Sequence, residues 1–175
     1  MPKIREVCIS NHTHQKFADM MERHRVNNLF ERPKTLIAHS GMTWALFKNS
    51  LKDMAQFDII NAVNRLWNTR KYRTDKENWR KADYWATPLE FAMKGGDCED
   101  YAIAKMLSLQ ELGLNVPMRL IGSRDHMLLY VDGLILDNRT YEVLKDFPRD
   151  FSPLVSISAD TMYLCREEKN EFRTV

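Results

Sequence analysis

The sequence contains no long apolar segment. Its apolar runs fall short of the roughly 18 residues that a membrane-spanning helix requires. The first six residues, Met-Pro-Lys-Ile-Arg-Glu, also lack the apolar stretch of a signal peptide. As it stands, the sequence predicts a soluble chain with no transmembrane segment and no visible export signal.

Cysteine is scarce, with three residues in a chain of 175. The spacing of Cys8, Cys98 and Cys165 forms neither a CxxC zinc pair nor a disulfide framework. Because the number is odd, at least one thiol is free. A disulfide between Cys8 and Cys165 is possible, but two unrelated structural thiols are the favoured interpretation.

Charge of one sign is not in excess, because 26 Lys and Arg face 24 Asp and Glu and leave a net charge of +2. The basic residues are scattered along the chain. The densest basic run, residues 65–81, also contains Asp75 and Glu77, and we interpret it as a solvated segment. Charge therefore gives no argument for a nucleic-acid partner.

The composition, 44% hydrophobic and 29% charged, is that of an ordinary globular protein long enough to bury one core. The histidines near the N-terminus, His12, His14 and His24, are interpreted as exposed rather than metal-binding, since no further ligand cluster lies nearby. The predicted divisions are a polar N-terminal segment (1–34), a single compact domain (35–166) and a charged tail (167–175).

The first half of the compact domain has helical periodicity. Phe57, Ile60 and Val63 recur at three- and four-residue steps, which line one face of a helix. The predictions here are helices over residues 36–51 and 53–67, followed by a long structured loop over residues 68–85.

Two helix starts follow each other. The run Thr87-Pro88-Leu89-Glu90 combines a capping threonine, a proline at the first helical position and a glutamate that closes a capping box. Gly95-Gly96 ends this short helix. Asp97 then caps a second helix that stops at Gly113. Apolar residues cover most of its circumference, so we expect the second helix to be the buried centre of the domain.

After Pro117 the pattern changes to short β-type runs. The dipeptide Asp132-Gly133 between two apolar runs is a strong signal for a hairpin with a two-residue turn. Helices followed by antiparallel strands predict an α+β fold, with the central helix packed on an antiparallel sheet. The predicted strands are residues 118–121, 126–131, 134–138, 141–144, 154–158 and 162–165.

Cys98 is the strongest candidate for chemistry. A thiol in the first turn of a helix feels the positive end of the helix dipole, which favours the thiolate. The neighbouring carboxylates of Asp97, Glu99 and Asp100 oppose this, since negative charge raises the pKa of a thiol. A reactive Cys98 therefore needs a cation nearby: an imidazolium, an Arg or Lys, or a hard cation such as calcium. The alternative is that the carboxylates only cap the helix and face solvent.

The hairpin supplies a base. With Asp132-Gly133 as the turn, Leu129 pairs with Leu136, and His126 and Asp137 share one face of the sheet. An aspartate that orients an imidazole, which serves a thiol on a neighbouring helix, is the relay of nucleophilic catalysis. Cys98, His126 and Asp137 are therefore the predicted catalytic residues. The alternative for each residue considered alone is structural: His126 is a histidine at the end of a strand, and Asp137 favours a turn.

Four stretches of the chain form a signature. They are DYWATPLEF (residues 83–91), GDCEDYAIAK (96–105), His126-Met127 and Leu136-Asp137-Asn138. Together they resemble the bacterial transglutaminase-like cysteine peptidases of the LapG type. The similarity covers about residues 63–164, which is most of the compact domain.

This resemblance implies a papain-like, transglutaminase-like fold in which Cys98 is the nucleophile, His126 the general base and acid, and Asp137 the orienting residue. It also implies calcium bound beside the nucleophile, with ligands that fall on Asp97, Glu99 and Asp100.

The resemblance further implies a periplasmic protease that cuts a large surface adhesin near its N-terminal anchoring region and so loosens biofilms. An inner-membrane receptor that senses cyclic di-GMP holds such proteases in check. This chain departs from the pattern in three ways. It shows no export signal, the segments around His126 are short, and Arg149-Asp150-Phe151-Ser152-Pro153 matches the family only loosely.

Three functions compete on these residues. In the first, Cys98 attacks a peptide carbonyl, and backbone N–H groups at the helix start, with Trp85 as a further candidate, hold the oxyanion. The second is acyl transfer to an amine by the same triad, as in transglutaminases. The third is a non-catalytic domain that binds calcium or a partner.

Overall fold

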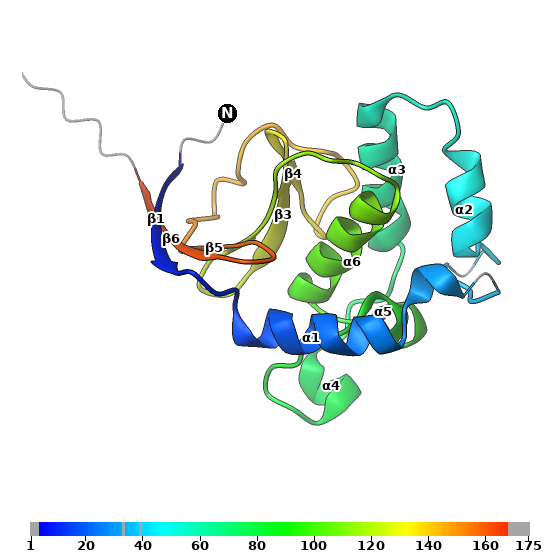
Figure 1. Cartoon of the computed structure of the whole chain (residues 1–175), viewed down its shortest axis with the longest axis horizontal. Helices are drawn as coiled ribbons and strands as arrows, with labels where there is room; N and C mark the ends of the chain where they lie inside the picture. The colour runs from blue at the N-terminus through cyan, green and yellow to red at the C-terminus, as the bar shows by residue number, and fades with distance from the viewer. Residues whose placement is uncertain (1–3, 33, 39, 168–175) are drawn as a thin grey trace, which may run out of the picture.

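The computed structural model describes residues 4–32, 34–38 and 40–167. Helices gather on one side of the molecule and a six-stranded sheet lies on the other (Figure 1). The helices are α1 (Gln15–Val26), α2 (Trp44–Ser50), α3 (Gln56–Asn68), α4 (Asp75–Trp79), α5 (Pro88–Lys94) and α6 (Cys98–Glu111), with a 3-10 turn η1 (Leu29–Glu31). The strands are β1 (Ile4–Ser10), β2 (Met118–Gly122), β3 (Met127–Val131), β4 (Leu134–Leu136), β5 (Val155–Ile157) and β6 (Met162–Glu167).

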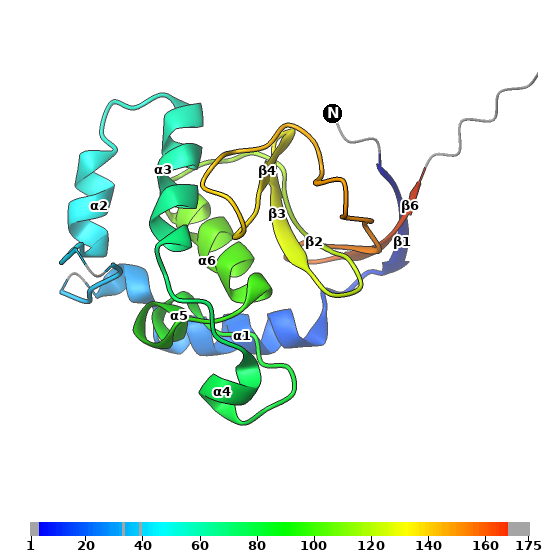
Figure 2. The ribbon, with the colours of Figure 1, turned by 180° about the vertical axis from the view of Figure 1, so that it is seen from behind.

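The sheet has the order β1-β6-β5-β2-β3-β4, and every neighbouring pair is antiparallel. Helix α6 lies between the sheet and the remaining helices, where it contacts β2, β3, α3 and α5 (Figures 1 and 2). All residues from Asp100 to Leu109 are buried. The prediction of an α+β fold with a buried central helix packed on an antiparallel sheet is therefore confirmed.

The short helix α5 and the glycine that ends it lead directly into α6, and both have the local structure that the sequence predicted. In α5, the Thr87 hydroxyl accepts the N–H of Glu90, and the Glu90 carboxylate accepts the N–H of Thr87, so the predicted capping box is confirmed. Gly95 ends α5 at φ +77°, a conformation that favours glycine. A Cβ on Gly95 would lie 2.2 Å from the carbonyl oxygen of Lys71. The glycine therefore lets residue 71 approach the helix start.

The hairpin has the predicted register. Leu129 pairs with Leu136, and Val131 pairs with Leu134. Asp132 and Gly133 both have positive φ, at +47° and +84°, as a primed two-residue turn requires. Since a slip of one residue would turn every side chain to the other face, this register determines where His126 and Asp137 lie.

Three predicted segments, a helix, a loop and a strand, were wrong in extent. Residues 36–51 are helical only from Trp44, because Thr43 caps the helix there and Leu36 pairs with Thr43 in an isolated bridge. The predicted loop over residues 68–85 contains the short helix α4, which a capping box between Thr74 and Glu77 stabilises. The predicted strand 141–144 amounts to one bridge between Leu144 and Ile135.

The N-terminal segment contributes to the fold more than its polar sequence suggested. Strand β1 pairs along β6 at one edge of the sheet, and α1 buries Phe17, Met20 and His24. The prediction that His24 is exposed was therefore wrong. Of the predicted tail 167–175, Glu167 ends β6 and the rest lies outside the described residues.

The three thiols are free, as the favoured interpretation had it. The β1–β6 register places Cys8 opposite Tyr163 and Cys165 opposite Glu6, so Cys8 and Cys165 do not face each other. Among the residues that the structure describes, no helix is long and apolar enough to cross a membrane.

Lys105 is an unusual member of the core. It lies on α6, its side chain is fully buried, and its Nζ has no hydrogen-bond partner among the described residues. Burial lowers the pKa of Lys105 to about 7, and the charge of Asp137 only partly opposes this. Since a buried polar group without a partner destabilises a fold, Lys105 is a weak point of the core.

Replacing Lys105 with methionine is expected to stabilise the fold near neutral pH by roughly 1–3 kcal/mol, because Met has similar length and no unpaired polar group. The gain should shrink as the pH rises. The unfolded chain keeps the lysine proton to about pH 10.4, whereas the folded chain releases it near 7, so wild-type stability rises between these values. Urea unfolding of both proteins at neutral pH and at about pH 9.5 measures the gap. A gap that widens with pH would contradict the expectation.

Candidate active site

Cys98 is the first residue of α6, and its side chain is half-buried where the helix start meets β3. Its thiol donates to a carboxylate oxygen of Glu99, with 3.2 Å between sulfur and oxygen. Burial, and then the charge of Glu99, raise the pKa of Cys98 well above its ordinary value. The backbone N–H of Met127 lies within reach of the sulfur and acts in the opposite direction. The described residues alone therefore favour the thiol over the thiolate.

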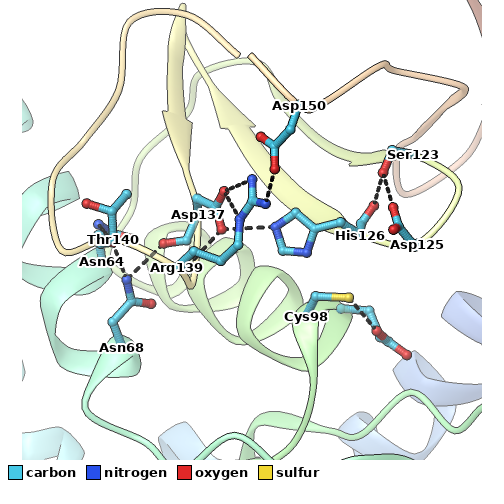
Figure 3. A network of polar contacts seen from close by, with 11 residues as sticks. Asn64, Asn68, Cys98, Ser123, Asp125, His126, Asp137, Arg139, Thr140 and Asp150 are labelled. Atoms are coloured by element: carbon cyan, nitrogen blue, oxygen red, sulfur yellow. Dashed lines mark hydrogen bonds and ion pairs between the residues drawn. The ribbon is translucent and has the colours of Figure 1, made fainter. Parts of the chain in front are cut away.

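His126 and Asp137 meet as the hairpin register predicted. Nε2 of His126 lies 2.9 Å from Oδ1 of Asp137, and the side chains are 13% and 1% exposed. Figure 3 shows the imidazole between the Asp137 carboxylate and Cys98. An ionised carboxylate only accepts hydrogen bonds, so Nε2 carries the hydrogen and Nδ1 remains as an acceptor. This is the tautomer that can take a proton from a thiol.

Arg139 completes the surroundings of Asp137. Its backbone N–H donates to Oδ1 at 2.9 Å and its Nε donates to Oδ2 at 3.0 Å, while Nη2 forms an ion pair with Oδ2 at 2.9 Å. Burial alone would raise the pKa of Asp137, but the hydrogen bonds from His126 and Arg139 outweigh it and hold that pKa well below its usual range. Asp137 is therefore ionised throughout the neutral range.

Helix α3 anchors the segment that carries Asp137. Nδ2 of Asn68, the last residue of α3, donates to the backbone carbonyls of Asp137 and Thr140 at 2.9 and 2.6 Å (Figure 3). Nδ2 of the buried Asn64, one turn earlier, donates to the carbonyl of Tyr141 at 3.2 Å. These contacts fix the backbone that follows β4. Sequence reasoning missed both asparagines because a polar residue in a helix gives no sign of a distant partner.

A second cluster lies beside the nucleophile. Carboxylate oxygens of Asp75, Asp97 and Glu99 all lie within 4.8 Å of one another. Oδ1 of Asp75 and Oδ1 of Asp97 are buried without a hydrogen-bond partner among the described residues. Burial, and then the charges of Glu99 and Asp75, raise the pKa of Asp97 to about 8. Three crowded carboxylates with unpaired oxygens form a donor set that suits a hard cation.

The membership of this cluster differs from the prediction in one residue. Asp97 and Glu99 belong to it, but Asp100 does not, and Asp75 from α4 lies there in addition. The Asp100 carboxylate turns inward, where it accepts the backbone N–H groups of Ala86 at 2.7 Å and Asp97 at 3.3 Å. A Cβ on Gly96 would lie 2.0 Å from this carboxylate, so the glycine makes room for it. Asp100 thus supports the helix start and lies outside this cluster.

Trp85 lies in the core, 6% exposed, and its ring stacks on His14 with 4.8 Å between the centroids. Its carbonyl accepts a hydrogen bond from Arg23 at 2.5 Å. The next residue, Ala86, contacts Asp100 of α6. Trp85 thus borders the segment that supports the helix start, and its role in an oxyanion hole stays a prediction.

A cysteine at the start of a buried helix, facing a histidine and an aspartate on an antiparallel sheet, is the arrangement of the papain-like and transglutaminase-like thiol enzymes. A comparison with protein families identifies one particular family within this class of enzymes. Residues 45–151 match the family of bacterial transglutaminase-like cysteine proteinases (BTLCP), and the chain belongs to that family. The protein is therefore a cysteine peptidase, and the resemblance seen in the sequence is confirmed.

Solved structures agree with this assignment. Calcium-bound LapG of Legionella pneumophila is 27% identical, with a TM-score of 0.61 over 84% of this chain and 86% of that one. A second structure of L. pneumophila LapG is 30% identical, with a TM-score of 0.58 over 69% and 74% of the two chains. An EGTA-treated form of the same protein, 24% identical over 87% of each chain with a TM-score of 0.59, shows the same fold. No curated protein matches the chain.

Proposed function

We propose that this protein is a calcium-dependent cysteine endopeptidase with Cys98 as nucleophile, His126 as general base and acid, and Asp137 as the orienting residue. One observation carries the proposal. The 2.9 Å bond between Nε2 of His126 and Asp137 leaves Nδ1 as the imidazole nitrogen that can serve Cys98. The helix start supplies the thiol, and the hairpin supplies its base.

The reaction follows from these positions. Nδ1 of His126 takes the proton of the Cys98 thiol, and the sulfur attacks the carbonyl carbon of the scissile peptide. Backbone N–H groups at the start of α6 stabilise the oxyanion. The C–N bond then breaks, the leaving amine takes the proton from Nδ1, and a thioester remains. Water attacks the thioester and gives a proton to Nδ1. The C–S bond then breaks, the sulfur takes that proton back from Nδ1, and the new carboxylic acid departs.

Calcium fits the carboxylates of Asp75, Asp97 and Glu99, because two of their buried oxygens lack any other partner among the described residues. When bound, the cation would supply the positive charge that favours the Cys98 thiolate and would engage the Glu99 oxygen that otherwise accepts the thiol hydrogen. The calcium-bound and EGTA-treated structures of L. pneumophila LapG support this proposal.

Calcium is expected to raise the melting temperature of the wild-type protein relative to chelator by about 5–10 °C at saturating concentration. Asp75→Asn should lose most of this shift, because it removes one of three charged ligands. In chelator the same variant should melt above the wild type, since it removes a buried carboxylate from a crowded cluster. Differential scanning calorimetry with and without calcium measures both effects.

Asp58→Asn is the matched control, because Asp58 lies in the first turn of α3 and outside the cluster. It should keep the full calcium shift. A wild-type protein whose melting temperature does not respond to millimolar calcium would contradict the proposed site.

By resemblance, we further propose that the substrate is a large surface adhesin cut near its N-terminal region in the periplasm, with biofilm release as the consequence. An inner-membrane receptor for cyclic di-GMP is the proposed inhibitor. The test incubates the protein with fragments of surface proteins encoded near its gene, with and without calcium, and maps each new N-terminus. One calcium-dependent new N-terminus supports the proposal. Incorporation of a labelled amine without net cleavage would favour acyl transfer instead.

A further inference from the structure

Asp137 makes more contacts than the orientation of His126 requires. Its Oδ1 accepts from the imidazole and from the backbone N–H of Arg139. Its Oδ2 accepts a hydrogen bond from Nε of the Arg139 guanidinium at 3.0 Å and forms an ion pair with Nη2 at 2.9 Å. A planar guanidinium that contacts one carboxylate oxygen through two of its nitrogens restrains the rotation of that carboxylate.

The same guanidinium reaches a second segment. Nη1 of Arg139 donates to Asp150 at 2.9 Å, and the two side chains are 42% and 70% exposed (Figure 3). The next residue, Phe151, is buried and packs edge-on against the His126 ring, with 6.0 Å between the centroids. Phe147 stacks on Phe151. Arg139 therefore joins the carboxylate that orients His126 to the segment that covers the His126 ring.

We propose that Arg139 is a positioning residue of this peptidase, which fixes the Asp137 carboxylate through its side chain and, through Asp150, holds Phe151 against the imidazole. This inference rests on the proposed function of Cys98, His126 and Asp137. Arg139 touches neither a substrate nor the sulfur. It acts on His126 through two groups: Asp137, which is hydrogen-bonded to Nε2, and Phe151, whose ring packs perpendicular to the imidazole.

Four charged or titratable groups lie around Asp137 or its partner Arg139. His126 directly precedes β3, Arg139 follows β4, and Lys105 lies on α6. Asp150 pairs with Arg139 and partly offsets its positive charge. Arg139→Gln removes the side-chain hydrogen bond and the ion pair with Asp137 and keeps the backbone bond. Since burial raises the pKa of Asp137, the carboxyl then protonates at a higher pH. Below that pH, His126 loses its oriented partner.

The test measures kcat and KM for the surface-protein fragment that the wild type cleaves, across the pH range, in calcium. Arg139→Gln should lower kcat roughly 10- to 100-fold with little change in KM, and the acidic limb of kcat/KM should move to higher pH. Arg139→Lys keeps the charge and should recover part of the rate and most of the limb position. Asp150→Asn, which leaves the bonds to Asp137 intact, should cost only about twofold to fivefold.

Arg149→Gln is the matched control, because it removes the same charge from the residue next to Asp150. It should match the wild type in rate and pH profile. An Arg139→Gln variant that melts normally and also matches the wild type in both would overturn the inference.

A readout without turnover separates this inference from the proposed function. The ¹⁵N shifts of His126 report the tautomer of its ring whether or not the protein cleaves anything. The wild type should show the tautomer with hydrogen on Nε2, and Arg139→Gln should show a smaller share of this tautomer at the same pH. If the wild type cleaves no more than Cys98→Ala, the proposed function fails, while an identical tautomer in both proteins at every pH overturns the role of Arg139.

Discussion

Replacing Cys98 with alanine is expected to abolish peptide cleavage, with a loss of about 10⁴-fold or more in kcat/KM. No other described thiol can take its place. Cys165 is buried on β6, where burial raises its pKa to about 11, and Cys8 lies on the edge strand β1. Without the sulfur no acyl-enzyme forms, and only substrate binding and the oxyanion donors remain. Cleavage of the surface-protein fragment, followed by mass spectrometry, measures the loss.

The fold provides the control for this variant. The Cys98 side chain is not among the three carboxylates of the cation cluster, so Cys98→Ala should keep the calcium-dependent rise in melting temperature. Cys8→Ala, a matched change at an exposed thiol, should leave cleavage unchanged. Iodoacetamide at mildly acidic pH in calcium should modify Cys98 faster than Cys8 or Cys165. Equal, slow modification of all three thiols would contradict a nucleophilic role.

The parts of the site that the sequence predicted are those set by local rules. The capping box at Thr87 and Glu90 and the glycines that follow place a cysteine at a helix start within a dozen residues. The turn at Asp132-Gly133 determines the register of the hairpin and with it the meeting of His126 and Asp137. In both cases the interacting residues lie close together in the chain, so the pattern of residue types contains the answer.

The missed parts depend on contacts between distant segments. Asp75 joins Asp97 because residues 71–73 run alongside Gly95-Gly96, and nothing local to Asp75 indicates that neighbour. The sequence alone does not distinguish the three carboxylates around Cys98, which belong to Asp97, Glu99 and Asp100. The structure separates them, because the backbone N–H groups of Ala86 and Asp97 turn Asp100 inward while Glu99 stays beside the thiol.

Arg139 was missed for a different reason. In the sequence, Arg149-Asp150 is part of a stretch that matches the family only loosely. In the structure, Asp150 binds the side chain of Arg139. An arginine two residues after a strand-end aspartate is common in turns and carries no signal by itself. Only the three-dimensional structure shows that Arg139 binds both Asp137 and Asp150. The same holds for β1, which pairs with β6, a segment more than 150 residues away in the chain.

Asp137→Asn is expected to lower kcat/KM by about 10²- to 10⁴-fold while the protein still folds. The amide has nearly the same shape as the carboxylate, but it carries one acceptor oxygen and one donor group. The Arg139 side chain contacts Oδ2 through Nε and Nη2, so the amide oxygen is expected to take the Oδ2 position beside the guanidinium. The amide NH₂ then faces Nε2 of His126 and donates to it.

This reversal moves the imidazole hydrogen to Nδ1, the nitrogen that faces Cys98. A protonated Nδ1 cannot accept the thiol proton, so the first step fails although all three side chains remain in place. The rate should fall with little change in KM, and ¹⁵N NMR should show the hydrogen on Nδ1. Asp125→Asn, the same change at an exposed residue next to His126, is the control and should cleave normally. An Asp137→Asn variant with its hydrogen still on Nε2 and near-normal activity would show that the carboxylate does not select the tautomer.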